Sequence, residues 1–223
     1  MTADATTMPA GEHAHAATTT HGSGGLGTPV LGMLLFITSE VMFFAGLFAA
    51  YFSIRANFTE GGVHVWPPST FARILSPNPF QLTESGSLNL ILPATIILIL
   101  SSFTCQLGVN AIKRDDRRGF IRNIAVTLTM GVLFLLLQAF DYSVLIHEGM
   151  TMGSGTFGTT YFTMTGFHGA HVFGGVLMLA VVLYRGMAGQ FSAKHHDMVE
   201  AMSLYWHFVD VVWILLFSTL YLL

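Results

Sequence analysis

The chain has 223 residues, of which 52% are hydrophobic and only 9% are charged. Soluble domains carry about 25% charged residues, so this composition excludes an ordinary globular protein. The mean hydropathy of +0.63 agrees with that conclusion, and a net charge of -3 gives no support for nucleic-acid binding. We therefore expect an all-α integral membrane protein, folded as a polytopic bundle of transmembrane helices.

Residues 1–28 differ in composition from the rest of the chain. They are rich in Ala, Thr, Gly and His, and they contain neither a basic start nor an apolar stretch. These features do not match a signal peptide. We expect a disordered cytoplasmic tail over residues 1–28 and one helical membrane domain over residues 29–223.

Five apolar stretches are long enough to cross a bilayer, which takes about 20 residues of helix. They cover approximately residues 30–54, 88–112, 123–146, 158–185 and 197–222. Trp66 lies in the loop between the first two stretches and is expected at the level of the lipid headgroups. The single cysteine, Cys105, lies inside the second stretch, which indicates packing rather than reactivity. In the fourth stretch small residues recur every fourth position and predict close helix packing: they are Gly166, Ala170 and Gly174.

The lysines and arginines predict the orientation of the bundle. With five spans, the tail and the loops 113–122 and 186–196 share one side of the membrane. That side carries seven basic residues, whereas the other side carries Arg55 and Arg73. Because cytoplasmic loops carry the excess of basic residues, the N-terminus is expected in the cytoplasm and the C-terminus outside. The seven residues are Lys113, Arg114, Arg117, Arg118, Arg122, Arg185 and Lys194.

Ionisable residues recur inside the predicted spans. A charge at the bilayer centre costs roughly 2.5 to 3.5 kcal/mol on insertion scales, so each such group must be neutral or have a partner. Two pairs are one helical turn apart, in the segments "TGFHGAHVFGG" and "YWHFVDVVW". The full set is Glu40, Asp141, His168, His171, Glu200, His207 and Asp210.

Three interpretations of these groups stay open from the residues alone. The first is structural, with hydrogen bonds that hold neighbouring helices together. The second is a haem b anchor, an electron-transfer protein in which two of His168, His171 and His207 ligate the iron. The third is a small proton-coupled transporter that uses Glu40 and Asp141. The sequence contains no cysteine cluster and no HExxH motif, so we expect no structural or catalytic metal site.

Several segments together resemble subunit III of the haem–copper cytochrome c oxidases. They are "ITSEVMFFAGLF", "LLQAFDY", "TGFHGAHVFGG", "KHHDMVEA" and "YWHFVDVVW", and the resemblance extends from residue 30 to residue 223. It implies a multi-pass subunit of a terminal oxidase in a bacterial plasma membrane. Such a subunit binds phospholipid, stabilises the catalytic subunit and supports proton uptake during electron transfer to oxygen, and it has no activity alone.

The resemblance also implies partners and cofactors. The expected protein partners are the catalytic subunit I and subunit II, and these subunits are expected to hold the haem and copper, with none on this chain. Quinol oxidases have a related subunit III, so the electron donor stays open. Family members often have seven spans, and this chain begins at what resembles the third. We therefore expect the family's lipid cleft to be incomplete here or to be completed by another chain.

Individual residues can be matched to the family. Glu40 matches the family's intramembrane glutamate, and His171 and Arg185 match positions that bind lipid headgroups, so these three residues form the expected lipid-binding set. The remaining polar groups are expected to be buried and structural: Asp141, His168, Glu200, His207 and Asp210. Asp141 departs from the family, which has glutamate at that position.

Overall fold

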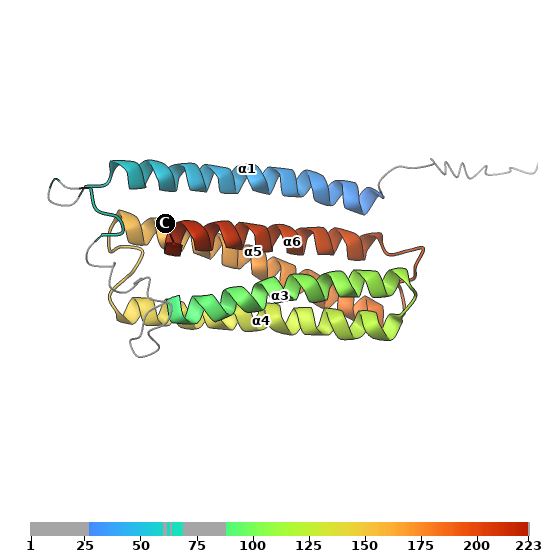
Figure 1. Cartoon of the computed structure of the whole chain (residues 1–223). Coiled ribbons are helices and arrows are strands. Elements are labelled where there is room, and N and C mark those ends of the chain that lie inside the picture. The colour runs from blue at the N-terminus through green and yellow to red at the C-terminus, as the bar shows by residue number, and fades with distance from the viewer. Residues whose placement is uncertain (1–26, 60–61, 63, 69–87, 223) are drawn as a thin grey trace, which may run out of the picture.

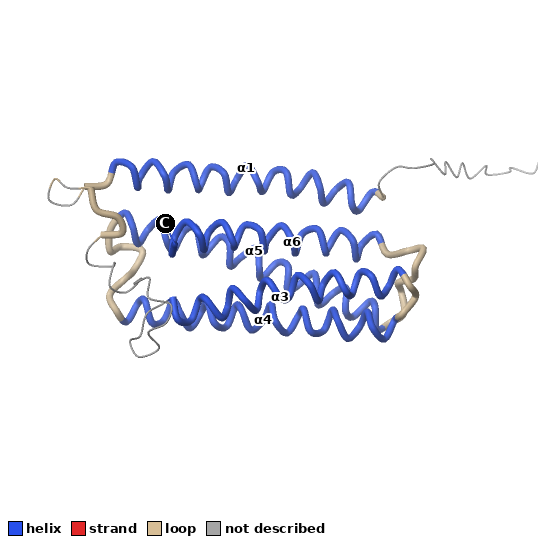
Figure 2. Tube along the Cα trace, viewed as in Figure 1, coloured by secondary structure: helices blue, strands red, loops and turns tan. Residues whose placement is uncertain are grey.

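The computed structural model describes residues 27–59, 62, 64–68 and 88–222, and this part of the chain contains five long helices. The described residues contain no β-strand (Figures 1 and 2). The final turn, η1 (Ser218–Leu222), is π-helical and continues the last helix. The helices are α1 (Thr28–Asn57), α3 (Leu88–Lys113), α4 (Arg117–His147), α5 (Thr156–Met187) and α6 (Asp197–Phe217).

The predicted membrane fold is confirmed, because all five helices are long and apolar enough to span a bilayer. One boundary was wrong. Helix α4, the third of the five, begins at Arg117, six residues before the predicted start, so the loop predicted at 113–122 shrinks to a tight turn. Asp116 caps this helix by accepting a hydrogen bond from the backbone N–H of Gly119 at 2.9 Å. The helix therefore extends past its apolar part into a basic first turn.

Helix α6 lies at the centre of the bundle and α1 at its edge. In the most apolar segment of each helix, 61% of the α6 residues are buried but only 11% of the α1 residues. Helices α3, α4, α5 and α6 pack around one core, and α1 packs mainly on α6 (Figure 1). This arrangement leaves most of the α1 surface to lipid or to another protein.

Trp206 of α6 fills the middle of the core between α4 and α5. Its side chain is fully buried, and its indole N–H donates to Ser101 Oγ at 2.9 Å. A Cβ atom on Gly131 would lie 2.6 Å from this ring, and one on Gly175 would lie 2.8 Å from it. Both positions therefore require glycine.

The prediction that Gly166, Ala170 and Gly174 form the close-packing stripe was wrong. Ala170 is exposed, and a Cβ on Gly166 or Gly174 would meet its nearest atom only at 3.8 Å or 3.5 Å, an ordinary contact distance. The face of α5 that packs closely is offset by one residue, at Gly175.

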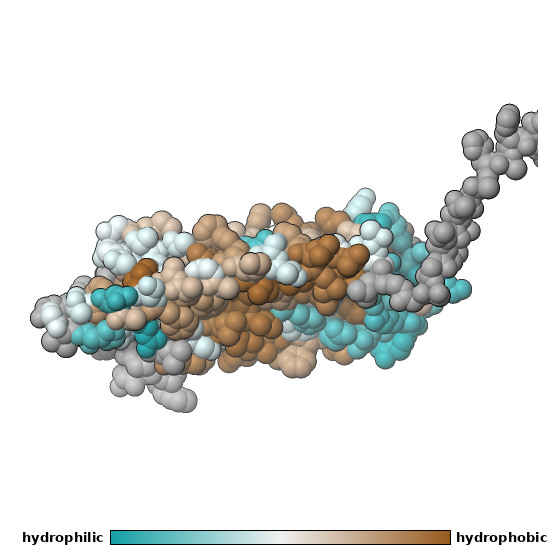
Figure 3. Space-filling model, turned by 90° about the horizontal axis from the view of Figure 1, so that it is seen from above, coloured by the Kyte–Doolittle hydropathy of each residue, from teal (hydrophilic) through white to brown (hydrophobic). Residues whose placement is uncertain are grey.

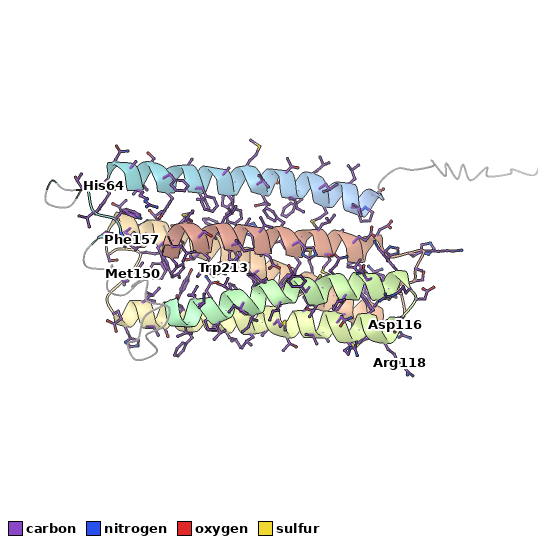
Figure 4. The ribbon with its side chains drawn as sticks, viewed as in Figure 1. His64, Asp116, Arg118, Met150, Phe157 and Trp213 are labelled. Carbon is purple, nitrogen blue, oxygen red and sulfur yellow. The ribbon has the colours of Figure 1, made fainter. Side chains whose placement is uncertain are left out.

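Hydrophobic and polar side chains are segregated along the bundle. A hydrophobic band crosses the middle of the molecule, with hydrophilic residues towards both ends (Figure 3). Asp116 and Arg118 lie at one end, and His64, Met150 and Phe157 at the other (Figure 4). Trp66 lies at the second end, where it packs against Phe157 with ring centroids 5.0 Å apart. Arg73 and the predicted tail up to residue 26 lie outside the described residues.

Candidate functional site

Glu40 of α1 and His171 of α5 form a hydrogen-bonded pair between the two helices. Glu40 Oε2 lies 2.9 Å from His171 Nε2, and the side chains are 19% and 16% exposed. The other ring nitrogen, Nδ1, lies 2.7 Å from the Phe167 carbonyl oxygen. A carbonyl oxygen only accepts hydrogen bonds, so Nδ1 carries a proton. No partner for Glu40 could be identified from the residues alone; the structure identifies His171.

Aromatic side chains surround this pair. The rings of Phe43 and Phe44 lie 6.3 Å and 5.0 Å from the His171 ring. Tyr205 donates its hydroxyl hydrogen to the His171 carbonyl oxygen at 3.0 Å, which ties the site to α6. Glu40 is twelve residues into α1, about 18 Å from its start. The pair is therefore near the middle of the span and partly shielded by aromatic rings.

Arg185 lies in the last turn of α5, far from the pair. Fourteen residues separate it from His171, which is about 21 Å along a helix. Its Nε donates to Gln190 Oε1 at 2.7 Å, and its guanidinium lies 5.3 Å from the centre of the Phe191 ring. The structure thus places the three expected lipid-binding residues in two separate places: Glu40 and His171 meet between α1 and α5 at midspan, and Arg185 lies at the end of α5.

Asp141 lies at the opposite end of the bundle from Arg185 and is 1% exposed. Tyr161 lies with its hydroxyl 3.4 Å from Asp141 Oδ2, and the hydroxyls of Tyr161 and Tyr221 are in close hydrogen-bonding contact. These contacts connect α4, α5 and η1.

His168 is completely buried between aromatic rings. Its ring stacks on Trp213 at 4.9 Å and meets Phe134 edge-on at 6.1 Å. Neither ring nitrogen has a hydrogen-bond partner among the described residues. The contacts of this histidine are those of a core side chain.

Glu200 lies closer to the surface than expected. It is in the first turn of α6, and its side chain is 32% exposed. Oε1 lies 2.6 Å from Lys113 Nζ and 3.4 Å from His196 Nε2. Surface pairs of this kind contribute little stability, about 0 to 1 kcal/mol. The hydrogen bond from Lys113 offsets part of the free-energy cost of removing the Glu200 carboxylate from water at the end of the span.

His207 and Asp210 are joined to α3 through residues that the sequence analysis missed. Ser102 donates its hydroxyl hydrogen to Asp210 Oδ2 in a short contact, and its oxygen lies 3.0 Å from His207 Nδ1. His207 Nε2 lies 3.4 Å from Gln106 Oε1. The polar run in "LSSFTCQLGVN", within an otherwise apolar span, could have indicated this role.

The three histidines do not converge on one site. His171 pairs with Glu40, His207 with Ser102, and His168 packs against Trp213. Across the part of the chain that the structure describes, no three His, Cys, Asp or Glu side chains are grouped as metal ligands. Glu40 and Asp141, the pair required by the transporter interpretation, lie on different helices and contact residues of α5 that are ten positions apart, His171 and Tyr161. The arrangement favours structural hydrogen bonding between helices.

Comparison with known proteins agrees with this arrangement. The family model described as "Cytochrome c oxidase subunit III" matches residues 8–223. A "Probable cytochrome c oxidase subunit 3" of Nocardia farcinica is 40% identical over 191 residues, which cover 86% of each chain. The "Cytochrome c oxidase subunit 3" proteins of Corynebacterium diphtheriae and Thermostichus vulcanus are 41% and 40% identical, over 86% and 87% of each chain. The chain therefore belongs to the cytochrome c oxidase subunit III family and is a membrane subunit of an oxidoreductase complex.

Proposed function

We propose that this chain is a supporting subunit of a bacterial cytochrome c oxidase. It lies in the plasma membrane, next to the catalytic subunit I and subunit II. In this role it holds phospholipid, stabilises the catalytic subunit and helps to maintain proton uptake. The haem and copper belong to the partner subunits. The bacterial sources of its relatives support this location, and their names support cytochrome c as the electron donor.

The basic end of the bundle is the cytoplasmic end in this proposal. Arg114, Arg117 and Arg118 lie in or beside the α3–α4 turn, and Arg185 lies in the last turn of α5. The anionic headgroups of the inner leaflet attract such residues. The N-terminus then lies in the cytoplasm and the C-terminus outside.

The separation of Arg185 from the Glu40–His171 pair supports lipid binding along α5. A bilayer is about 40–45 Å thick including its headgroups, so one leaflet measures about 20–22 Å. Arg185 and His171 are fourteen residues apart on one helix, about 21 Å. One phospholipid with its phosphate on Arg185 would reach the Glu40–His171 pair with the ends of its acyl chains.

The Arg185 guanidinium is suited to the headgroup end. A guanidinium presents a planar fork of donors that matches a phosphate. Gln190 and Phe191 hold it in place by a hydrogen bond and a ring contact, so little side-chain freedom is lost when a phosphate binds. At the deep end, Phe43 and Phe44 offer apolar surface to acyl chains.

The test compares oxidase purified in mild detergent through a tag on this chain, as wild type and as Arg185→Ala. We expect both to contain haem and copper with a haem a band in the reduced-minus-oxidised spectrum. The variant should lose anionic phospholipid and inactivate sooner during turnover, with an initial rate of oxygen consumption near that of wild type. Arg118→Ala, at an exposed position of the same end, is the matched control and should behave as wild type.

Three results would contradict the proposal. A wild-type preparation with b-type haem alone would indicate a quinol oxidase or the haem b anchor instead. Unchanged lipid content in Arg185→Ala would remove Arg185 from the lipid site. An initial rate reduced as much as the late rate would indicate defective assembly rather than lipid loss.

A further inference from the structure

Ser102 and Gln106 of α3, with His207 and Asp210 of α6, form a continuous group of polar side chains, here called the polar quartet. Ser102 contacts both Asp210 and His207, and His207 contacts Gln106. Asp210 is only 5% exposed, whereas Gln106 is exposed. The polar quartet therefore extends from the interior of the bundle to its outer surface.

The outer end of the quartet lies within the hydrocarbon region of the membrane. Gln106 precedes Lys113, the last residue of α3, by seven residues, and His207 follows the first residue of α6 by ten. At 1.5 Å per residue these positions are about 10 Å and 15 Å from the helix ends. Water is scarce at that depth, and lipid chains offer no hydrogen bonds.

Apolar side chains surround the exposed amide. Phe103 is 65% exposed, Leu107 52% and Val211 55%. These apolar side chains alone would suit lipid, but polar side chains within a membrane hydrogen-bond across packed helices, so the exposed amide among them indicates a surface that meets another helix. The surface lies where α6 is flanked by α1 and α3, away from α5, which lies behind α6 in Figure 1.

Gln106 retains hydrogen-bonding capacity that the described residues do not use. Its Nε2 donates to Asn110 Oδ1 at 3.3 Å, and its Oε1 faces His207. A side-chain amide has two N–H donors and two acceptor lone pairs, so one of each is left. A second amide or a hydroxyl group, which offers both a donor and an acceptor, would satisfy them.

We infer that the polar quartet, with Phe103, Leu107 and Val211 around it, is the surface on which a transmembrane helix of another oxidase subunit docks. A side-chain amide or hydroxyl of that helix meets Gln106. The inference rests on the proposed function in one respect, namely that the chain is assembled with other oxidase subunits. Beyond that function, the inference identifies the face of this chain that meets another oxidase subunit.

Site-specific photo-crosslinking in the intact oxidase tests this surface. The photoreactive residue p-benzoylphenylalanine replaces Phe103 in one variant and Phe140 in the other. Phe103 lies on α3 beside Gln106, and Phe140 lies on α4 at 57% exposure, so the two positions are matched in residue type and nearly in exposure. We expect irradiation to join position 103 to another oxidase subunit, and position 140 to lipid.

Three outcomes would overturn the inference: position 103 joined only to lipid, position 103 joined to a second copy of this chain, or equal yields of the same subunit from both positions. Each can occur in a complex that still contains haem and copper, in which case the proposed function stands while the docking surface does not. Failure of any oxidase subunit to co-purify with the wild-type chain would instead contradict the proposed function.

A substitution in the quartet provides a second measurement. Gln106→Leu removes the polar contact, because it replaces the exposed amide by an apolar side chain of similar size. We expect a several-fold lower crosslinking yield from position 103 and earlier loss of this subunit in detergent. An unchanged yield and unchanged retention would show that Gln106 makes no contact with another subunit.

Discussion

The hydrogen bonds of His171 limit the charge that the Glu40–His171 pair can carry. Nδ1 donates to the Phe167 carbonyl, and Nε2 faces Glu40 Oε2. If the ring were neutral and Glu40 ionised, the lone pair of Nε2 would face a lone pair of Glu40 Oε2. A proton must therefore lie between the two atoms. Either a carboxylic acid donates to a neutral ring or an imidazolium donates to a carboxylate. The pair is net neutral in both cases, which suits a site at midspan.

This geometry predicts unequal effects of substitutions in the pair. Glu40→Gln keeps a donor for Nε2, because the amide N–H takes the place of the shared proton. His171→Phe leaves the Glu40 carboxyl without its partner in a region poor in water, which is the more costly change. We expect His171→Phe to lower the temperature at which the complex loses this subunit by more than Glu40→Gln does.

The double variant sharpens this prediction. Glu40→Leu combined with His171→Phe replaces both polar partners by apolar groups, which can be nearly neutral when the shapes fit. The double variant should therefore retain the subunit to a higher temperature than His171→Phe alone. If adding Glu40→Leu lowers retention further, the two residues act independently and the pair is not a hydrogen-bonded unit.

Residue-level partners were the least predictable part of the site. Glu40 and His171 are separated by 131 positions in the chain, and only the packing of α1 against α5 and α6 brings them together. Ser102 and Gln106 were missed for a similar reason, since a polar residue in an apolar span does not show which helix it faces. His168 and Asp210 could be predicted as buried groups because polar residues far from the span ends are expected inside the bundle, whereas Asp141 lies only six residues before the end of α4.

At the scale of helices, close packing depends on which glycine meets a large ring. Gly175 lies against Trp206, and both are buried. Periodicity identified α5 as a helix with small residues but selected a face one residue away from the correct one. A spacing of four is compatible with more than one face of a helix, and the position of Trp206 on another helix decides between them.

Gly175→Ala is predicted to destabilise the bundle. Its Cβ would lie 2.8 Å from the buried Trp206 ring, which can move only by displacing α3 or α4. Overpacking a core costs about 1 to 3 kcal/mol. The melting temperature of the purified complex should fall, and the tryptophan fluorescence should change.

Gly46→Ala on α1 is the matched control. No atom lies within 4 Å of a Cβ at Gly46, and alanine forms helix better than glycine. The melting temperature should therefore stay the same or rise. A similar fall in both variants would indicate that loss of glycine, rather than contact with Trp206, causes the effect.

At the scale of the whole molecule, lipid replaces water as the solvent for most of the outer surface. Large apolar side chains such as Leu35, Met42 and Leu136 are 66%, 74% and 63% exposed. Each helix must be apolar along its length whether it meets lipid or protein. Composition and the length of the apolar stretches therefore predicted the five spans. Which apolar face meets protein and which meets lipid could not be predicted, since both neighbours favour the same side chains.

The orientation of the bundle follows from its charges and can be measured directly. All described basic residues except Arg55 gather at the end of the bundle that holds the α3–α4 and α5–α6 connections, so this end should face the cytoplasm. In a Cys105→Ser background, single cysteines at Arg118→Cys and Met152→Cys mark the two ends, and Met152 is 59% exposed. In right-side-out vesicles a membrane-impermeant maleimide should label Met152→Cys at once and Arg118→Cys only after detergent is added. The reverse pattern would place the basic end outside, and with it Arg185 and the lipid leaflet that it is proposed to bind.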